Sequence, residues 1–192
     1  MMNNNPRHIV TGQVRLSYVN LLKPYAREGQ EAKYSATILV PKTDTATKAR
    51  IDAAINAAKQ DGPAKWGGVI PPIVAIPVHD GDGVRPSDGM PFGEECKGHW
   101  VFTASSKIQP EIVDININPI LDPTEIYSGL YARVGVTFFA YNAGGKKGIG
   151  CGLETVQKLQ DGEPLSNRAS ASDDFGSIQP VHQINPITGL PL

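Results

Sequence analysis

An alternating stretch in the second half of the chain constrains the fold most strongly. From Leu130 to Tyr141 the sequence is LYARVGVTFFAY, and every second residue, beginning with Leu130, is apolar. Successive side chains of a strand point to opposite faces, so this set predicts a buried face. The other set carries Tyr131, Arg133 and Phe139 as well as Tyr141. We therefore expect a β-strand whose outer face is aromatic and cationic.

Other parts of the chain carry strand and helix patterns. Strands are expected at residues 8–20, 32–40, 73–78, 99–107, 112–116 and 153–159. In the first of these strands, Val14, Leu16 and Tyr18 are expected on one side and Arg15 and Ser17 on the other. One helix is expected at about 44–60, because Asp44 can cap it and apolar residues recur there at spacings of three and four.

Composition and element order together predict the fold class. Gly (20 residues) and Pro (16 residues) are frequent, which favours turns and short strands over long helices. Residues 62–98 are rich in Gly, Pro and Asp and predict a long loop. We expect a mainly β protein with one helix, long loops and a flexible C-terminal tail, built as a five-stranded barrel or a sandwich. One domain is expected over 1–160, followed by a partly acidic tail over 161–192.

Charge and cysteine content set broad limits on the class of protein. The chain of 192 residues has a net charge of −1, with a slightly basic body and an acidic segment after residue 150. Its two cysteines, Cys96 and Cys151, are too few for a disulfide framework. The N-terminus lacks the apolar core of a signal peptide, and no apolar run approaches the roughly 18 residues of a membrane span. A reducing cytoplasm is the expected compartment.

Two patterns resemble metal sites, and both are incomplete. Asp80 and Asp82 are spaced like the start of a calcium loop, but Val84 and Arg85 stand where that loop needs an oxygen ligand and a glycine. A Gly/Asp turn is therefore expected. A structural zinc site usually has two close pairs of ligands, and the sequence offers one such pair in the segment CKGH. We expect neither a metal nor a cofactor.

The glycine-rich segment GGKKGIGCG, at 144–152, does not have the order of a phosphate-binding loop. It lacks G-x4-GK-[ST] and follows a strand without opening a helix, so a flexible hairpin tip with two lysines is expected. No G-x-S-x-G or H-E-x-x-H motif occurs, and nothing singles out a pair of carboxylates. A non-enzymatic protein is expected, with a metal enzyme built on the 79–95 loop as a rival hypothesis.

The aromatic outer face of the 130–141 strand is the strongest indication of function. Exposed rings on a sheet stack unpaired bases, form a subunit interface or lie under a covering loop. Single-stranded nucleic acid needs ring faces for its bases and nearby cations for its phosphates. Residues that could supply them are Tyr131, Arg133, Phe139, Tyr141, Lys146, Lys147, Trp100, Phe102, Lys107, Trp66, Lys65 and Arg15. Burial under loops and a subunit interface stay open as alternatives.

Several blocks of the chain together resemble a bacteriophage single-stranded DNA-binding protein family. They include RLSYVNLLKPY, KGHWVFTASSK, DPTEIYSGLYARVGVTFFAYN and KKGIGCGLETVQKLQDGEPL, and the similarity runs over roughly residues 8–175. The resemblance implies an OB-fold barrel and a non-catalytic protein that coats single-stranded DNA during phage replication or recombination. It also implies little sequence preference and a place in the cytoplasm of the infected bacterial host.

The resemblance extends to an acidic segment near the C-terminus. The sequence SASDDF is similar to the tip with which such proteins contact replication or recombination partners, which implies a partner-binding role for Asp173, Asp174 and Phe175. This chain differs from that pattern because it continues with the nearly uncharged GSIQPVHQINPITGLPL. The rival hypothesis from a different class is a phage structural or assembly protein that uses the aromatic face as a subunit interface. A homo-oligomer is compatible with either hypothesis.

Overall fold

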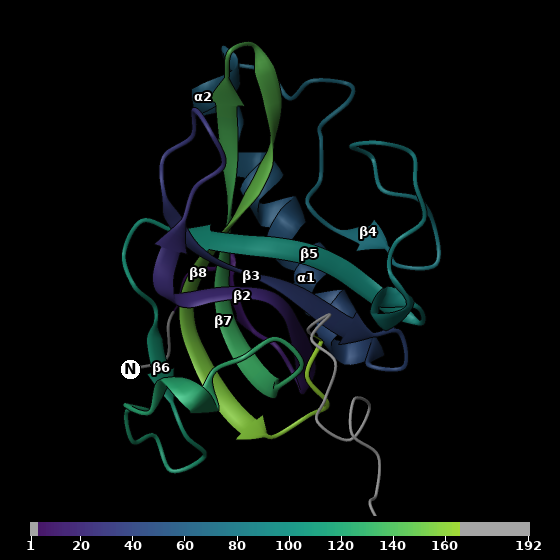
Figure 1. Ribbon diagram of the computed structural model, residues 1–192. Helices are drawn as coiled ribbons and strands as arrows, with labels where there is room; N and C mark the ends of the chain where they lie inside the picture. The colour runs from purple at the N-terminus through teal and green to yellow at the C-terminus, as the bar shows by residue number, and fades with distance from the viewer. Residues whose placement is uncertain (1–3, 166–192) are drawn as a thin grey trace, which may run out of the picture.

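The structure is a computed structural model that describes residues 4–165 (Figure 1). The proposed partner-binding residues Asp173, Asp174 and Phe175 lie outside the described residues, as does most of the expected tail. The strands are β1 (His8–Val10), β2 (Val14–Tyr25), β3 (Lys33–Pro41), β4 (His79–Asp80), β5 (His99–Ser106), β6 (Glu111–Val113), β7 (Tyr131–Ala143) and β8 (Lys146–Gln160). The helices are α1 (Thr45–Asp61) and α2 (Pro63–Trp66), with 3-10 turns η1 (Glu94–Cys96) and η2 (Pro123–Glu125).

Five of the strands close into a ring that is not a regular barrel, and the mainly β, OB-like fold class is confirmed. The order around the ring is β7, β2, β3, β5 and β8, and β8 pairs with β7 again. Strands β1 and β6 extend the sheet beyond β7 and β8, and β4 pairs with β5. Two of the strand pairings in this ring are short. Strand β5 pairs with β8 only through Ser105 and Gly152, and β2 pairs with β7 only through Val14 and Arg15.

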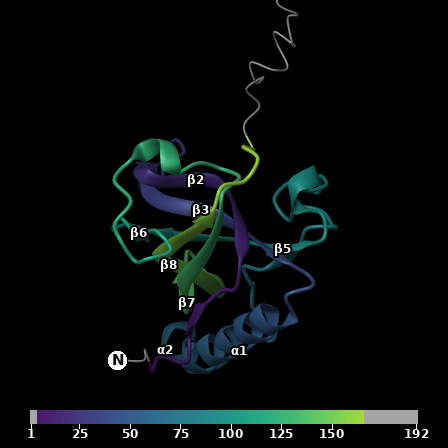
Figure 2. The same ribbon diagram turned by 90° about the horizontal axis from the view of Figure 1, so that it is seen from below.

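The alternation in β7 places its apolar set in the core, as the sequence predicts. Ala132, Val134, Val136 and Phe138 are buried, and so is Leu130 just before the strand. The helix α1 lies next to β7, on the side of the molecule opposite β2 and β3 (Figure 2). It buries one apolar face, made of Ile51, Ala54, Ile55 and Ala58.

The helix begins where the sequence predicts it. The carboxylate of Asp44 accepts hydrogen bonds from the backbone N–H and the hydroxyl of Thr47. This satisfies one of the backbone donors that the first turn leaves free. The short helix α2 follows directly and was not expected from the sequence.

Strand β2 departs from its predicted pattern in two ways. It continues to Tyr25, beyond the expected end at residue 20, and it carries a bulge between Ser17 and Asn20. The extra residue changes the face of the following side chains. Tyr18 is consequently 71% exposed, whereas Val14 and Leu16 are buried, and the expectation that all three lie on one side of the strand is wrong.

Strand β8 begins earlier than predicted, at Lys146, so that β7 and β8 form a long hairpin. The far end of this hairpin stands above β5, beside α2 (Figure 1). The strand expected at 73–78 is absent among the described residues; only Ala75 forms a bridge, to Gly148 of β8. This bridge ties the long loop to the hairpin close to its tip, because Gly148 lies only three residues after the turn.

Candidate functional site

A groove of about 630 Å³ opens between the β7–β8 hairpin, β5 and the long loop. Its walls are Lys33, Ala75, Ile76, Pro77, His79, Thr103, Ser105, Phe139, Tyr141, Ala143, Ile149, Gly150 and Cys151. The lining therefore combines the rings of Phe139 and Tyr141, the imidazole of His79, the hydroxyl groups of Thr103 and Ser105 and a lysine, and it contains no Asp or Glu. We call this the aromatic groove.

The rings of Phe139 and Tyr141 lie against β8 because β8 has glycines opposite them. Phe139 pairs with Gly150 and Tyr141 pairs with Gly148. A Cβ on Gly150 would meet the Phe139 ring at 2.6 Å, and one on Gly148 would meet Tyr141 at 2.7 Å. The glycines of the 144–152 segment thus leave room for two rings over the strand. Phe139 remains 40% exposed, and Tyr141 is partly exposed.

Contacts from α2 hold the hairpin in place. The indole N–H of Trp66 donates to the carbonyl of Tyr141 at 2.8 Å, and the Lys147 ammonium donates to the carbonyl of Trp66 at 2.9 Å. The side-chain amide of Asn142 donates to the carbonyl of Lys65 at 3.2 Å. Trp66 is 1% exposed, so its predicted exposure for base stacking is wrong. Its observed contact positions the strand that carries Tyr141.

The predicted exposed face of β5 is also corrected. Phe102 is 1% exposed and packs on Phe138, with ring centroids 6.0 Å apart. Trp100, on the same face, is half-buried, and the ammonium groups of Lys42 and Lys48 lie 5.1 and 4.7 Å from its ring. Because β5 is one of the five strands that enclose the core, its largest apolar side chains point inward. The opposite set, which includes Thr103 and Ser105, faces the aromatic groove.

Arg133 lies at a different depression from Phe139 and Tyr141. It is exposed and lines a second groove of about 240 Å³ with Val10, Ile117 and Gln157, among others. The two grooves share no lining residue. The sequence placed all of these side chains on one face of one strand. Arg133 precedes Phe139 by six residues along β7, which is about 20 Å, and the register between β7 and β8 shifts between them, where β8 carries the extra residue Glu154.

Two further predicted residues pair with each other at the start of β7. The Arg15 guanidinium lies 5.7 Å from the centre of the Tyr131 ring. It also donates to the backbone carbonyls of Glu163 and Gly129. These contacts hold the segment that follows β8 against β2, away from the aromatic groove.

The predicted lysines have different surroundings. Lys107 pairs with Glu31 at 2.9 Å, which offsets its charge. Lys65 and Lys146 are exposed near the hairpin, and Lys147 is partly buried by its contact with Trp66. Lys33, which the sequence analysis did not select, lines the aromatic groove.

The groove also contains residues that sequence reasoning missed. Thr103 and Ser105 alternate with buried residues in the segment TASS, and this alternation was a usable signal. His79 of β4 also lines the groove. Burial lowers its pKa, so that near neutral pH it is an uncharged donor or acceptor rather than a cation.

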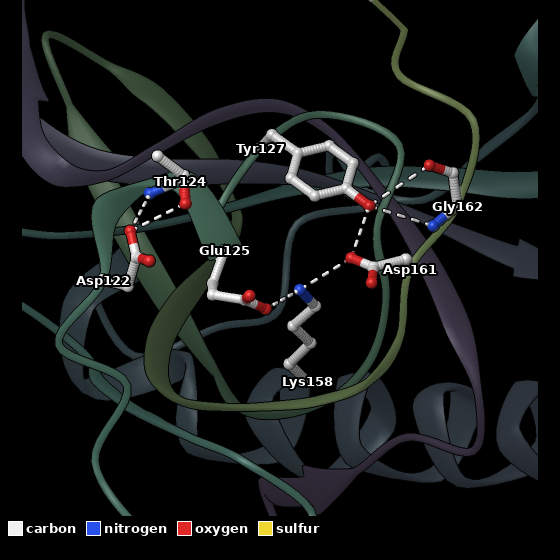
Figure 3. Close-up of polar contacts among 7 residues, drawn as sticks. All are labelled: Asp122, Thr124, Glu125, Tyr127, Lys158, Asp161 and Gly162. Carbon is white, nitrogen blue, oxygen red and sulfur yellow. Dashed lines mark hydrogen bonds and ion pairs between the residues drawn. The ribbon is translucent and has the colours of Figure 1, made fainter.

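A separate polar cluster surrounds Lys158 (Figure 3). The Lys158 ammonium contacts the carboxylates of Glu125 and Asp161, the latter at 2.8 Å. Burial by itself lowers the pKa of Lys158, but the hydrogen bonds to both carboxylates outweigh it, and the pKa is raised. The Tyr127 hydroxyl donates to Asp161 at 2.7 Å and accepts from the N–H of Gly162. The cluster joins η2 and the segment after β8 to the barrel.

The candidate metal positions have other partners in the structure. The Lys42 ammonium lies 2.6 Å from a carboxylate oxygen of Asp80 and 2.5 Å from one of Asp82, and these contacts lower the pKa of both aspartates. Burial raises the pKa of the Cys96 thiol to about 11 and also raises that of Cys151. Within residues 4–165, no three His, Cys, Asp or Glu side chains gather in a way that could hold a metal ion.

None of the helices in the described part of the chain is long and apolar enough to cross a membrane.

Comparison with known proteins connects this geometry to one family. Residues 7–184 match the family described as the ssDNA-binding protein of Enterobacter phage Enc34. A relative called putative protein p50, from Acyrthosiphon pisum secondary endosymbiont phage 1, is 31% identical over 182 residues, which is 88% of this chain and 93% of the relative.

Solved structures give the same connection. The single-stranded DNA-binding protein from bacteriophage Enc34, solved in complex with ssDNA, is similar with a TM-score of 0.72 and 30% identity, over 83% of this chain and 90% of that one. The single-stranded DNA-binding protein gp2.5 of bacteriophage T7 is similar in fold, with a TM-score of 0.58 and 14% identity over 93% of this chain and 98% of that one.

Proposed function

Because the chain belongs to the family of the single-stranded DNA-binding protein of Enterobacter phage Enc34, we propose that it binds single-stranded DNA in the aromatic groove. The observation that carries the proposal is the chemistry of the groove. Two rings lie over glycines of β8, a lysine and two hydroxyl groups stand opposite, and no carboxylate lines the walls. The Enc34 protein with a similar fold was solved with ssDNA bound.

Each part of the groove supplies one element of single-strand recognition. The outward faces of Phe139 and Tyr141 stack on bases, a contact worth about 1–3 kcal/mol per base. Lys33 inside the groove and the exposed Lys146 at the hairpin tip attract phosphates. Thr103 and Ser105 offer hydroxyl groups to phosphate or sugar oxygens. Stacking accepts every base, so we expect binding with little sequence preference.

The biological role follows from this binding mode. We infer that the protein coats and protects single-stranded DNA during phage replication or recombination, in the cytoplasm of the infected host, without catalysing a reaction. Contact with replication or recombination proteins through Asp173, Asp174 and Phe175 is part of the same proposal.

Fluorescence anisotropy of a labelled oligonucleotide tests the function. A thymine oligomer of about 30 nucleotides and a duplex of the same length are titrated with protein at two salt concentrations. We expect tight binding that favours the single strand and weakens with salt, with a slope of about −0.7 per neutralised phosphate. Absence of binding at micromolar protein and low salt would overturn the proposal.

A pair of variants tests the location of the site. Replacing both Phe139 and Tyr141 by Ala removes both ring faces, and we expect the affinity to fall by about tenfold or more. Arg133→Ala is the matched control, because Arg133 belongs to the same outer set of β7 but lies at the second groove. Its affinity should change little. A large loss in Arg133→Ala with no loss in the double variant would place the site at the second groove.

The rival hypothesis, an assembly protein with the aromatic face as its subunit interface, predicts a different result. It requires a fixed oligomer that dissociates when Phe139 and Tyr141 are replaced, and no DNA binding. Measuring the oligomeric state of the same double variant therefore distinguishes the two hypotheses.

A further inference from the structure

Tyr18 is held in a backbone conformation that aromatic residues rarely adopt. Its φ angle is +47°, and among the non-glycine residues of the described part only Ile117 shares a positive φ. Its side chain is 71% exposed, so burial of the ring does not compensate for the strain. Strain of this kind persists where the surrounding structure enforces it, and it is concentrated at functional sites.

Hydrogen bonds on both sides fix the bulge that carries Tyr18. The N–H of Val19 donates to the Ser128 hydroxyl at 3.1 Å. The side-chain amide of Asn20 donates to the carbonyl of Tyr18 at 3.2 Å and reaches the Ser35 hydroxyl at 3.5 Å. The bulge is thus set by β2, by β3 and by the segment before β7. The ring of Tyr18 is exposed at a defined position.

Two rows of small polar residues lead across the sheet from the Tyr18 bulge to the aromatic groove. One row runs from Ser17 on β2, which is buried, to the partly exposed Thr37 and the exposed Thr103. The second row runs from Asn20 to Ser35 and Ser105, all three partly exposed. The first row contains a hydroxyl pair at 3.1 Å, between Thr37 and Thr103. Thr103 and Ser105 are walls of the groove, whereas Tyr18 lies between the β2 ends of the two rows. Neighbouring strands are about 4.8 Å apart, so the rows span about 10 Å.

We propose that Tyr18 is a further stacking position for the same single strand. The DNA strand whose bases stack on Phe139 and Tyr141 continues across β5 and β3, over the polar rows. One of its later bases then stacks on Tyr18. The path thus runs across the sheet and does not follow β7 toward Arg133. The rows carry no charged side chain, so they neither repel phosphates nor fix one register of bases. This inference rests on the proposed function of the groove.

The test measures affinity as a function of oligonucleotide length. Thymine oligomers of about 4 to 16 nucleotides cover the range of site sizes known for one OB-fold. In the wild type, we expect affinity to rise with length until the strand reaches Tyr18. In Tyr18→Asn this rise should stop at a shorter length, and affinity for the longest oligomer should fall by about tenfold. Tyr18→Phe, which keeps the ring, should behave like the wild type.

Stability separates a binding role from a structural one. Asn tolerates a positive φ better than Tyr does, so Tyr18→Asn should keep or raise the melting temperature while it lowers affinity. Ile117→Asn is the matched control. Ile117 also has a positive φ and is 73% exposed, but it lies at the second groove. Its replacement should keep or raise the melting temperature and leave affinity unchanged at every length.

Two results would overturn the inference without affecting the proposed function. One is an identical length dependence in Tyr18→Asn and the wild type, while replacement of Phe139 and Tyr141 still weakens binding. The other is an equal loss of affinity in Ile117→Asn. Failure of the wild type to bind any oligomer would contradict the proposed function itself.

Discussion

Three glycines on one face of β8 have different neighbours. Gly148 and Gly150 lie beneath the rings of Tyr141 and Phe139, whereas a Cβ on Gly152 would meet only Thr137 O at 3.5 Å and the edge of Phe139 at 3.8 Å. Contacts of that length are ordinary van der Waals contacts. A methyl group added at Gly148 or Gly150 would therefore collide with an aromatic ring, whereas one added at Gly152 would fit.

Gly150→Ala should displace the Phe139 ring. The added methyl group overlaps the ring, so the ring must leave its preferred rotamer, at a cost of about 1 kcal/mol in the free energy of unfolding. We expect affinity for single-stranded DNA to fall about fivefold, because the ring no longer presents its face. Gly152→Ala is the control and should keep wild-type affinity and stability. Urea unfolding and anisotropy measure both effects, and equal behaviour of the two variants would contradict the arrangement of rings over glycines.

At the scale of elements, the hairpin and α2 form one unit. The tip of the hairpin projects beyond the barrel, and the contacts of Trp66 with Tyr141 and Lys147 fix its angle (Figure 1). An isolated two-stranded hairpin is marginally stable in water. The order of the aromatic groove therefore depends on a helix that lies far from it in sequence.

Trp66→Phe should loosen the hairpin. It leaves the Tyr141 carbonyl without its indole donor and removes buried volume, so we expect the free energy of unfolding to fall by about 2 kcal/mol. Hydrogen exchange of the backbone amides of 139–148 should become faster. Trp100→Phe is the comparison, since no hydrogen bond joins its indole to the hairpin in the described residues. Unchanged exchange in Trp66→Phe would show that the hairpin is held by other contacts.

The dependence of stability on pH in acid is set by carboxylates throughout the fold, several of which are stabilised in their charged form. A hydrogen bond donated to the carboxylate is the largest cause of a lowered pKa in Asp44, Asp80, Asp82, Asp114, Asp122 and Asp161. The unfolded chain, with aspartate pKa values of about 3.9, binds more protons in acid than the folded chain does. These groups therefore contribute stability above that pH and lose it as the pH falls further.

Stability should consequently begin to fall below about pH 6.5, because the unfolded chain protonates His79 more readily than the folded chain does, and should fall more steeply below about pH 4, where the aspartates contribute. Urea unfolding followed by circular dichroism at several pH values measures this dependence. Asp44→Asn removes one contributing carboxylate but keeps an N-cap side chain, so its loss of stability in acid should be smaller. Stability that increases on acidification would contradict the lowered pKa values.

Much of the architecture was predictable from local patterns. The apolar alternation in Leu130–Ala140 gave the core face of β7, and Asp44 with the apolar spacing after it gave α1. Both signals are local, because strand alternation and helix capping depend on neighbours within a few residues. The direction of Phe102 was not predictable in this way, since HWVF is apolar on both faces of β5.

By itself, the sequence determined the strand and helix pattern, the family and the presence of an aromatic outer face at Phe139 and Tyr141. The tertiary structure decided which candidate residues share a site. Trp66 and Phe102 became core residues because α2 and the closed ring of strands bury them. Arg133 lines a second groove because it lies six residues before Phe139 along a long strand. Lys33, Thr103 and Ser105 joined the rings from other strands. Local periodicity sets the face of a side chain, whereas pairing between distant strands, bulges and bends set its neighbours.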